Sequence, residues 1–212
     1  MIMKTFALFH PGEMGAALGA ALASRGFRVL WTSQGRSTQT TARAKAASLE
    51  DAGTMKQAVQ AAEVVVSLCP PHAALALARE AAADGFAGIY VDANAISPAT
   101  AREIGTVIEA AGGTFVDGGI IGLPPTPQKQ PTLYLSGTHA AAIAALFAQT
   151  NILAEVIEGG TGGFSAQNVL RRVYQRYHRS FSRGAGLGRT RRRGSSATGI
   201  MATHTAGCTA PI

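Results

Sequence analysis

Short apolar segments alternate with alanine-rich helical patterns through the first 158 of the 212 residues. The apolar segments are rich in β-branched and aromatic side chains, and most lack a polar face, which is typical of strands that are covered on both sides. The predicted strands are Thr5–Phe9, Arg28–Trp31, Val64–Leu68, Ile89–Asp92, Thr114–Asp117 and Thr132–Leu135.

Helical patterns occupy the intervals between these strands. Gly26 is a C-terminal cap residue for the first helix, and Ser97 and Pro98 stand at the cap and first-turn positions of the fourth. Alternating strands and helices predict parallel strands, right-handed crossovers and helices on both faces of a doubly wound α/β sheet. The predicted helices are Glu13–Arg25, Met55–Ala62, Ala73–Asp84, Ala99–Ala111 and Ala140–Gln149.

Composition excludes several classes of protein. A hydrophobic content of 47% with only 15% charged residues excludes a wholly disordered chain. Cys69 and Cys208 are too few for a disulfide framework or a four-cysteine zinc site, so we expect no metal and a reducing cytosol. The apolar run Phe6–Phe9 is too short for a secretory signal, and no run approaches a membrane span, which predicts a soluble cytoplasmic protein.

The net charge of +7 is unevenly distributed. Residues 1–158 carry all twelve acidic residues, four lysines and six arginines, for a net −2, whereas residues 159–212 carry nine arginines and no acid. We therefore expect a folded domain over 1–158, the start of an amphipathic helix within 159–181, and a disordered arginine-rich tail over 182–212. The helix is predicted from an apolar stripe of Val169, Leu170, Val173, Tyr174, Tyr177 and Phe181.

A glycine-containing turn follows the first predicted strand and opens directly into a helix. It reads His10-Pro-Gly-Glu-Met-Gly15, a GxGxxG pattern in which histidine replaces the first glycine. Such glycines let a pyrophosphate approach the backbone, and the helix N-terminus supplies amide donors. We expect Gly12, Glu13, Met14 and Gly15 to bind a dinucleotide; the alternative is an ordinary strand-to-helix turn.

The end of the second strand distinguishes between cofactors. NAD-binding folds usually place an acidic residue there to accept hydrogen bonds from the ribose, whereas a 2′-phosphate needs hydroxyl and cationic donors. Here Trp31 is followed by Thr-Ser-Gln-Gly-Arg36, without a carboxylate. Ser33 and Arg36 therefore favour NADP over NAD, unless Arg36 is merely a solvated loop residue.

Four motifs in order resemble the β-hydroxyacid dehydrogenase and 6-phosphogluconate dehydrogenase family over about residues 3–163. They are Gly12-Glu-Met-Gly15, Leu68-Cys-Pro-Pro71, Val91-Asp-Ala-Asn-Ala-Ile-Ser-Pro98 and Phe115-Val-Asp-Gly-Gly-Ile-Ile-Gly122. The resemblance implies a Rossmann-like domain followed by a helical domain of more than a hundred residues, which completes the active site and usually a homodimer. It also implies a small-molecule substrate.

The resemblance also assigns site residues. It implies that Cys69, Pro70 and Asn94 lie along the nicotinamide side of the cofactor. Asp92, Asn94 and Ala95 stand where the family has aspartate, serine and threonine, and Gly118 and Gly119 belong to a turn that has lost the family's serine. Asn94, Ala95, Gly118 and Gly119 are therefore predicted to face a substrate that differs from that of the best-known members; alternatively, Asn94 is only a turn former.

The family's catalytic lysine has no counterpart. The turn Gly159–Gly163 matches the one that precedes its helix, but the lysine would fall near Asn168 or Val169, and no lysine follows Lys129. The catalytic residue is thus unknown. A shifted reading frame explains this tail best, and the alternative is a basic arm whose arginines and aromatics bind phosphates and bases.

The function expected from these observations is that of an NADP-dependent oxidoreductase acting on a small hydroxy acid or related carbonyl. We expect its activity to be impaired in this chain, and we do not expect the family's homodimer to persist. The alternative is a non-catalytic protein with a basic tail that binds a dinucleotide or nucleic acid. A nucleic-acid or membrane partner is not expected.

Overall fold

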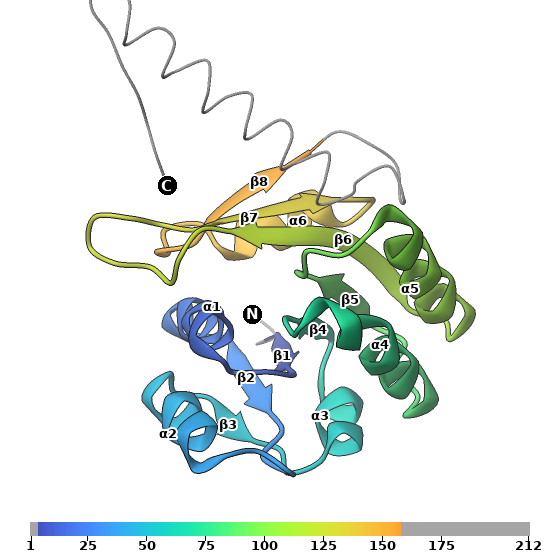
Figure 1. Ribbon diagram of the computed structural model, residues 1–212, viewed down its shortest axis with the longest axis horizontal. Helices are drawn as coiled ribbons and strands as arrows, with labels where there is room; N and C mark the ends of the chain where they lie inside the picture. Colours follow the sequence, from blue (N-terminus) through green and yellow to red (C-terminus); the bar gives the residue numbers. More distant parts are fainter. Residues whose placement is uncertain (1–3, 158–212) are drawn as a thin grey trace, which may run out of the picture. The chain divides into compact units, whose positions relative to one another are not determined.

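The computed structural model describes residues 4–157. These residues form one eight-stranded sheet with six α-helices and a short 3₁₀ helix (Figure 1). The strands are β1 (Thr5–Leu8), β2 (Arg28–Trp31), β3 (Glu50–Asp51), β4 (Val64–Ser67), β5 (Ile89–Asp92), β6 (Thr114–Ile121), β7 (Thr132–Ser136) and β8 (Leu153–Val156). The helices are α1 (Glu13–Ser24), α2 (Thr38–Ala46), α3 (Met55–Ala61), η1 (Pro71–Ala73), α4 (Ala74–Ala83), α5 (Pro98–Ala110) and α6 (Ala140–Leu146).

The strand order is β3-β2-β1-β4-β5-β6-β7-β8. The first six strands are all parallel, in the order of a doubly wound dinucleotide-binding sheet. The chain proceeds outward from β1 to β3 and then returns to place β4 on the other side of β1. The predicted α/β Rossmann-like fold is therefore confirmed, and the point at which the strand order reverses lies between β1 and β4.

The prediction of parallel strands throughout is wrong for β7, which runs antiparallel to β6. A parallel connection needs a crossover of a dozen or more residues, usually a helix, whereas only residues 122–131 join these two strands. This connection turns at Gly122, which has a φ of 125°, and its Thr126 and Lys129 are paired by an isolated antiparallel bridge. The segment is thus a hairpin, and β8 then adds parallel to β7.

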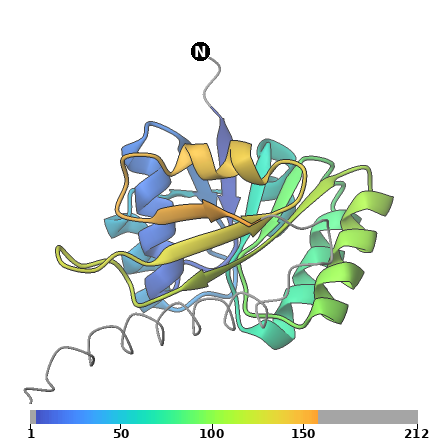
Figure 2. The same ribbon diagram turned by 90° about the horizontal axis from the view of Figure 1, so that it is seen from above.

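Two apolar layers cover the faces of the sheet. Leu18 and Leu22 of α1, Ala44 of α2 and Ile143 of α6 pack on one face. Ala58 of α3, Ala78 of α4 and Ile104 of α5 pack on the other, so that successive residues of the central strands point into opposite layers. The ribbon views show α1 and α2 on one side of the central strands and α4 and α5 on the other (Figures 1 and 2). This two-sided burial explains why the strands lack a polar face.

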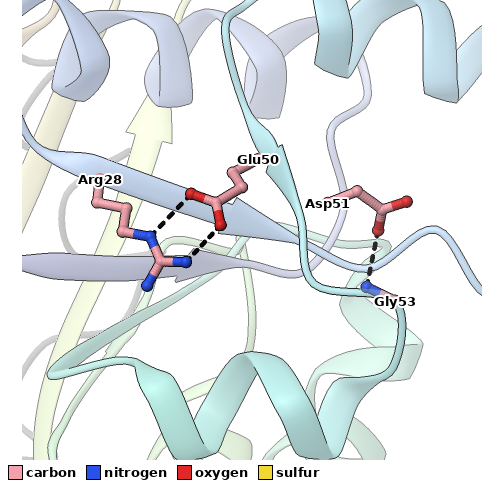
Figure 3. A network of polar contacts seen from close by, with 4 residues as sticks. All are labelled: Arg28, Glu50, Asp51 and Gly53. Atoms are coloured by element: carbon pink, nitrogen blue, oxygen red, sulfur yellow. Dashed lines mark hydrogen bonds and ion pairs between the residues drawn. The ribbon is translucent and has the colours of Figure 1, made fainter.

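The outer strand β3 has only two residues and is held partly by polar contacts (Figure 3). Arg28 at the start of β2 forms two hydrogen bonds with Glu50, including Nε to Oε2 at 2.8 Å. Asp51 accepts a hydrogen bond from the backbone of Gly53 at 2.8 Å. Arg28 and Glu50 are exposed, so the ion pair aligns β3 more than it stabilises the fold.

Local signals placed most helix ends to within one residue, but α6 ends at Leu146 and not at the predicted Gln149. The Ser97 hydroxyl accepts a hydrogen bond from the Thr100 amide with Pro98 in the first turn of α5, and Gly26 follows α1 with a φ of 81°. The elements α2, β3 and β8 were not predicted. The predicted helix within 159–181 and the predicted disorder over 182–212 lie outside the described residues. Within residues 4–157, no helix is long and apolar enough to cross a membrane.

Candidate dinucleotide-binding site

A cavity of about 380 Å³ opens at the carboxyl ends of β1 and β4, where the strand order reverses. Ligands of open α/β sheets bind at this position because the loops diverge there. The lining comes from the turn after β1, from the segment after β2 and from the loop after β4. It consists of His10, Pro11, Gly12, Glu13, Met14, Gly15, Arg36, Thr40, Leu68, Cys69 and Pro70.

The two glycines of the turn differ in what surrounds them. A Cβ on Gly12 would meet no atom within 4 Å, so the space beside Gly12 is open to a ligand. A Cβ on Gly15 would lie 2.1 Å from the backbone oxygen of His10, so only a glycine lets the first turn of α1 pack this closely against the backbone of His10. Gly12 is the N-cap of α1, where the first-turn amides have no intrahelical acceptors and favour an anion.

Arg36 lies over the end of β1. Its guanidinium donates a hydrogen bond to the Phe9 carbonyl at 3.3 Å, and the residue lines the same cavity as the turn. The Nε of Arg36 and the Nδ1 of His10 are both buried and have no hydrogen-bond partner in the described part of the chain. Burial, and secondarily the charge of Arg36, lowers the pKa of His10 to about 4, so the imidazole is neutral at physiological pH.

A buried polar network lies beside the cavity, below the β4 loop. The Asn94 side chain accepts a hydrogen bond from the Cys69 amide at 2.6 Å and donates to the Ser67 hydroxyl at 3.2 Å. The Asn94 side chain also donates to Asp92 Oδ2 at 3.0 Å, and the backbone amide of Asn94 donates to Asp92 Oδ1 at 2.8 Å. Asn94 therefore fixes the loop after β4 to the loop after β5, and with it the position of Cys69 in the cavity wall.

Four polar residues form a row across β4, β5, β6 and β7 in register: Ser67, Asp92, Asp117 and Ser136. All four are buried. Desolvation raises the pKa of Asp92 to about 7, although hydrogen bonds from Asn94 oppose the shift. Desolvation and the neighbouring charge of Asp92 raise the pKa of Asp117 to about 7. The row thus holds two carboxyl groups that titrate near neutrality.

The structure brings most of the predicted cofactor residues together. Gly12, Glu13, Met14, Gly15, Arg36, Cys69 and Pro70 all line the cavity. Ser33 and Asn94 do not line it. The Ser33 carbonyl accepts a hydrogen bond from the Arg36 amide at 3.0 Å and so shapes the turn that carries Arg36, and Asn94 is buried beside the cavity. Burial raises the pKa of the Cys69 thiol, which favours the protonated form.

The predicted substrate residues lie farther along the carboxyl edge. Ala95 is exposed, whereas Asn94, Gly118 and Gly119 are buried. A Cβ on Gly118 would lie 2.6 Å from the Tyr134 carbonyl, so this glycine permits the close approach of β6 and β7. A Cβ on Gly119 would be 3.7 Å from the Asn94 carbonyl, which places Gly119 next to the β5 loop.

Sequence reasoning did not assign His10 to the site, nor the pairing of Asp92 with Asp117. The signal for His10 was present, since it occupies the first glycine position of the motif. The aspartates end two strands that the sequence predicts, but their pairing depends on β5 and β6 being neighbours in register. Thr40 also lines the cavity and belongs to α2, which was not predicted.

Residues 6–158 match the family model described as the NAD binding domain of 6-phosphogluconate dehydrogenase, and the chain belongs to this family. The described residues accordingly form an NAD(P)-binding domain, and the family resemblance of the sequence motifs is confirmed. No curated protein sequence matches the chain.

Several solved structures share the fold. One is a conserved protein of unknown function described as similar to 3-hydroxyacid dehydrogenases, with 28% identity, a TM-score of 0.67, and coverage of 86% of this chain and 71% of that one. A second is a variant imine reductase from Myxococcus stipitatus in complex with NAD⁺, with 21% identity, a TM-score of 0.67, and coverage of 88% and 65%. A third is a reductive aminase from Aspergillus terreus in complex with NADPH, cyclohexanone and allyl amine, with 17% identity, a TM-score of 0.66, and coverage of 86% and 64%. The chain thus spans less than two thirds of each of the last two proteins.

Proposed function

We propose that this chain binds NADP in preference to NAD, as the cofactor-binding part of an oxidoreductase that acts on a small hydroxy acid or related carbonyl. The observation that carries the proposal is the position of Arg36. Arg36 lines the cavity beside Gly12 and Gly15, and the segment from Thr32 to Arg36 contains no carboxylate that would repel a 2′-phosphate.

The cavity fits a dinucleotide in three respects. The open space at Gly12 leaves room for a pyrophosphate against the backbone. The first turn of α1 offers amide donors and the positive end of the helix dipole. Arg36 lines the cavity, and its guanidinium is a charged donor group for an anionic oxygen.

When bound, the nicotinamide cofactor supplies the hydride chemistry. The residues of this chain bind and orient it: Gly12 to Gly15 hold the pyrophosphate, Arg36 holds the 2′-phosphate with Ser33 shaping its turn, and Cys69 and Pro70 line the side toward the nicotinamide. Asn94 positions Cys69 through its hydrogen bond to the backbone. Asn94, Ala95, Gly118 and Gly119 stand along the carboxyl edge where the substrate would lie.

Turnover is a separate matter from cofactor binding. Residues 130–212 contain no lysine to assist proton transfer at the reacting hydroxyl. Loss of a general acid or base costs roughly 10²- to 10⁴-fold in rate, and arginine does not replace it because guanidinium stays protonated. We therefore propose cofactor binding with little hydride transfer in this chain.

The test is a comparison of NADPH and NADH binding to the full chain, measured by the change in nicotinamide fluorescence. NADPH should bind more tightly, and Arg36→Ala should weaken NADPH binding at least tenfold while leaving NADH binding unchanged. Charge-assisted hydrogen bonds, at about 1.5–3 kcal/mol each, account for this factor. Arg43→Ala, in α2 and outside the cavity lining, is the matched control. Equal affinities for the two nucleotides would disprove the NADP assignment.

A further inference from the structure

His10 replaces the first glycine of the turn with a titratable ring, and this ring lies next to Arg36. Both residues line the cavity, and both carry a buried side-chain nitrogen without a partner in the described residues, Nδ1 of His10 and Nε of Arg36. The Arg36 guanidinium is also held to the carbonyl of Phe9, the residue before His10. The two residues therefore lie together at the end of β1 and line the same cavity, and Arg36 is close enough to His10 to act on the charge of its imidazole.

We propose that His10 and Arg36 together form the site for the 2′-phosphate, and that His10 takes up a proton when this phosphomonoester binds. The inference rests on the proposed NADP function and deepens it by naming a second specificity residue. Without a phosphate, the imidazole remains neutral beside the guanidinium. With a phosphate between them, the protonated imidazole and the guanidinium both donate hydrogen bonds to the same anion, which compensates the repulsion between their two positive charges.

Electrostatics supports this coupling. The pKa of His10 is lowered to about 4, first by desolvation and then by Arg36. A negative charge about 4 Å away, at an effective dielectric constant near 20, is strong enough to bring that pKa back toward neutrality. Because binding then raises the pKa of His10, NADP binding takes up a proton and becomes tighter as the pH falls.

The cavity also has other charged or titratable groups in its lining. Glu13 in the first turn of α1, Arg36 after β2 and Cys69 after β4 line it together with His10. Burial keeps the Cys69 thiol protonated near neutral pH. Glu13 and Arg36 are present whether NAD or NADP is bound. The difference in proton uptake between the two nucleotides therefore reports the effect of the 2′-phosphate alone. That phosphate itself accepts a proton near pH 6, which sets the lower limit of the useful range.

The experiment is isothermal titration calorimetry of the full chain with NADP⁺ and NAD⁺ between pH 6.5 and 8.5, in two buffers of different ionisation enthalpy. NADP⁺ should bind about threefold or more tightly at pH 6.5 than at pH 8.5, with net proton uptake, whereas NAD⁺ should show neither effect. His10→Gln keeps an amide donor but cannot take up the proton, so it should abolish the pH dependence and weaken NADP⁺ binding selectively. His139→Gln, at the N-cap of α6, is the matched control.

The outcomes separate this inference from the function on which it rests. NADP⁺ preference without proton uptake by the wild-type chain would overturn the role of His10 and leave the NADP assignment intact. Unchanged proton uptake in His10→Gln would also overturn it, by placing the proton elsewhere. No preference for NADP⁺ over NAD⁺ would overturn both. The wild-type measurement needs no variant, so the inference stays testable even where His10→Gln does not fold.

Discussion

At the scale of single residues, the turn after β1 contains two glycines with different physical roles. Gly15 is needed by the fold, because a Cβ there would overlap the His10 carbonyl, whereas Gly12 is needed only by a ligand, because its Cβ would meet nothing. The sequence motif treats them alike. The motif predicts dinucleotide binding by both glycines, and the structure shows a different reason for the absence of a side chain at each.

Gly15→Ala should lower the free energy of unfolding by about 2–3 kcal/mol, since the backbone of a closely packed turn has to move. Gly12→Ala should lower it by about 1 kcal/mol or less, the cost of a poorer N-cap residue. Urea denaturation of the two variants measures both values. Equal losses would show that the turn is not packed as described.

The two buried carboxyl groups, Asp92 and Asp117, predict how the free energy of unfolding depends on pH. The pKa values of Asp92 and Asp117 rise from 3.8 to about 7 on folding. The folded chain therefore binds protons that the unfolded chain does not, and the free energy of unfolding increases as the pH falls through 7. From pH 8 to pH 6.5 the increase should be about 1 kcal/mol. His10, with its lowered pKa, has the opposite effect, which begins within this range and grows below pH 6.5, so the range ends there.

Asp117→Asn removes one of the two titrating carboxyl groups, so it should reduce this increase by about half. Asp84→Asn, at the C-terminal end of α4, is the control and should retain the wild-type slope. Denaturant titrations at pH 6.5, 7.25 and 8 measure the slopes. A stability that rises with pH over this range in the wild-type chain would contradict the buried pair.

At the scale of elements, α5 connects the β5 loop to the core. Its N-cap hydroxyl, Ser97, bonds the Thr100 amide, and its Ile104 and Ile108 are fully buried against the sheet. Ser97→Ala should therefore lower the free energy of unfolding by about 1 kcal/mol. The cap lies outside the cavity lining, so nucleotide affinity should not change.

Thr106→Ala is the control for this cap. Thr106 is exposed on the same helix, and its hydroxyl bonds only the Arg102 carbonyl one turn earlier, so its replacement should be neutral or slightly stabilising. Thermal denaturation of the two variants gives the comparison. A Ser97→Ala variant as stable as Thr106→Ala would show that the cap contributes nothing.

Elements with a complete local signal could be predicted from the sequence. Strands β2 and β5 have the expected bounds because each has three consecutive buried or half-buried apolar residues, with Arg28 at the start of β2 and Asp92 at the end of β5. Helix α2 was missed because its residues are mostly polar and only Ala44 is buried. Strand β3 was missed because it has two exposed acidic residues, paired only through the edge of β2.

The direction of β7 and the edge strand β8 depended on tertiary contacts. The sequence pattern of β7 is the same for either direction, and only the short connection without a helix distinguishes them. In the site, too, contacts between distant segments could not be predicted from local sequence. The turn and Arg36 were predicted from adjacent residues, whereas the contacts of Asn94 with Ser67 and Cys69 join segments 25 or more positions apart.

At the scale of the whole molecule, the cofactor site depends on a small part of the chain. The cavity is lined by residues between His10 and Pro70, and the family match ends at residue 158. All twelve acidic residues also lie at or before Glu158, whereas the arginine-rich segment follows it. Dinucleotide binding is therefore expected of the 212-residue chain irrespective of its capacity for hydride transfer.

The most direct test of this account is an NADPH titration of the full chain and its Gly12→Val variant, followed by nicotinamide fluorescence. The wild-type chain should bind NADPH with saturation. Gly12→Val should abolish binding while leaving the far-UV circular dichroism spectrum unchanged, because the added side chain enters space that only the pyrophosphate uses. NADPH binding by a folded Gly12→Val chain, with an affinity equal to that of the wild type, would contradict the assignment of this turn as the dinucleotide site.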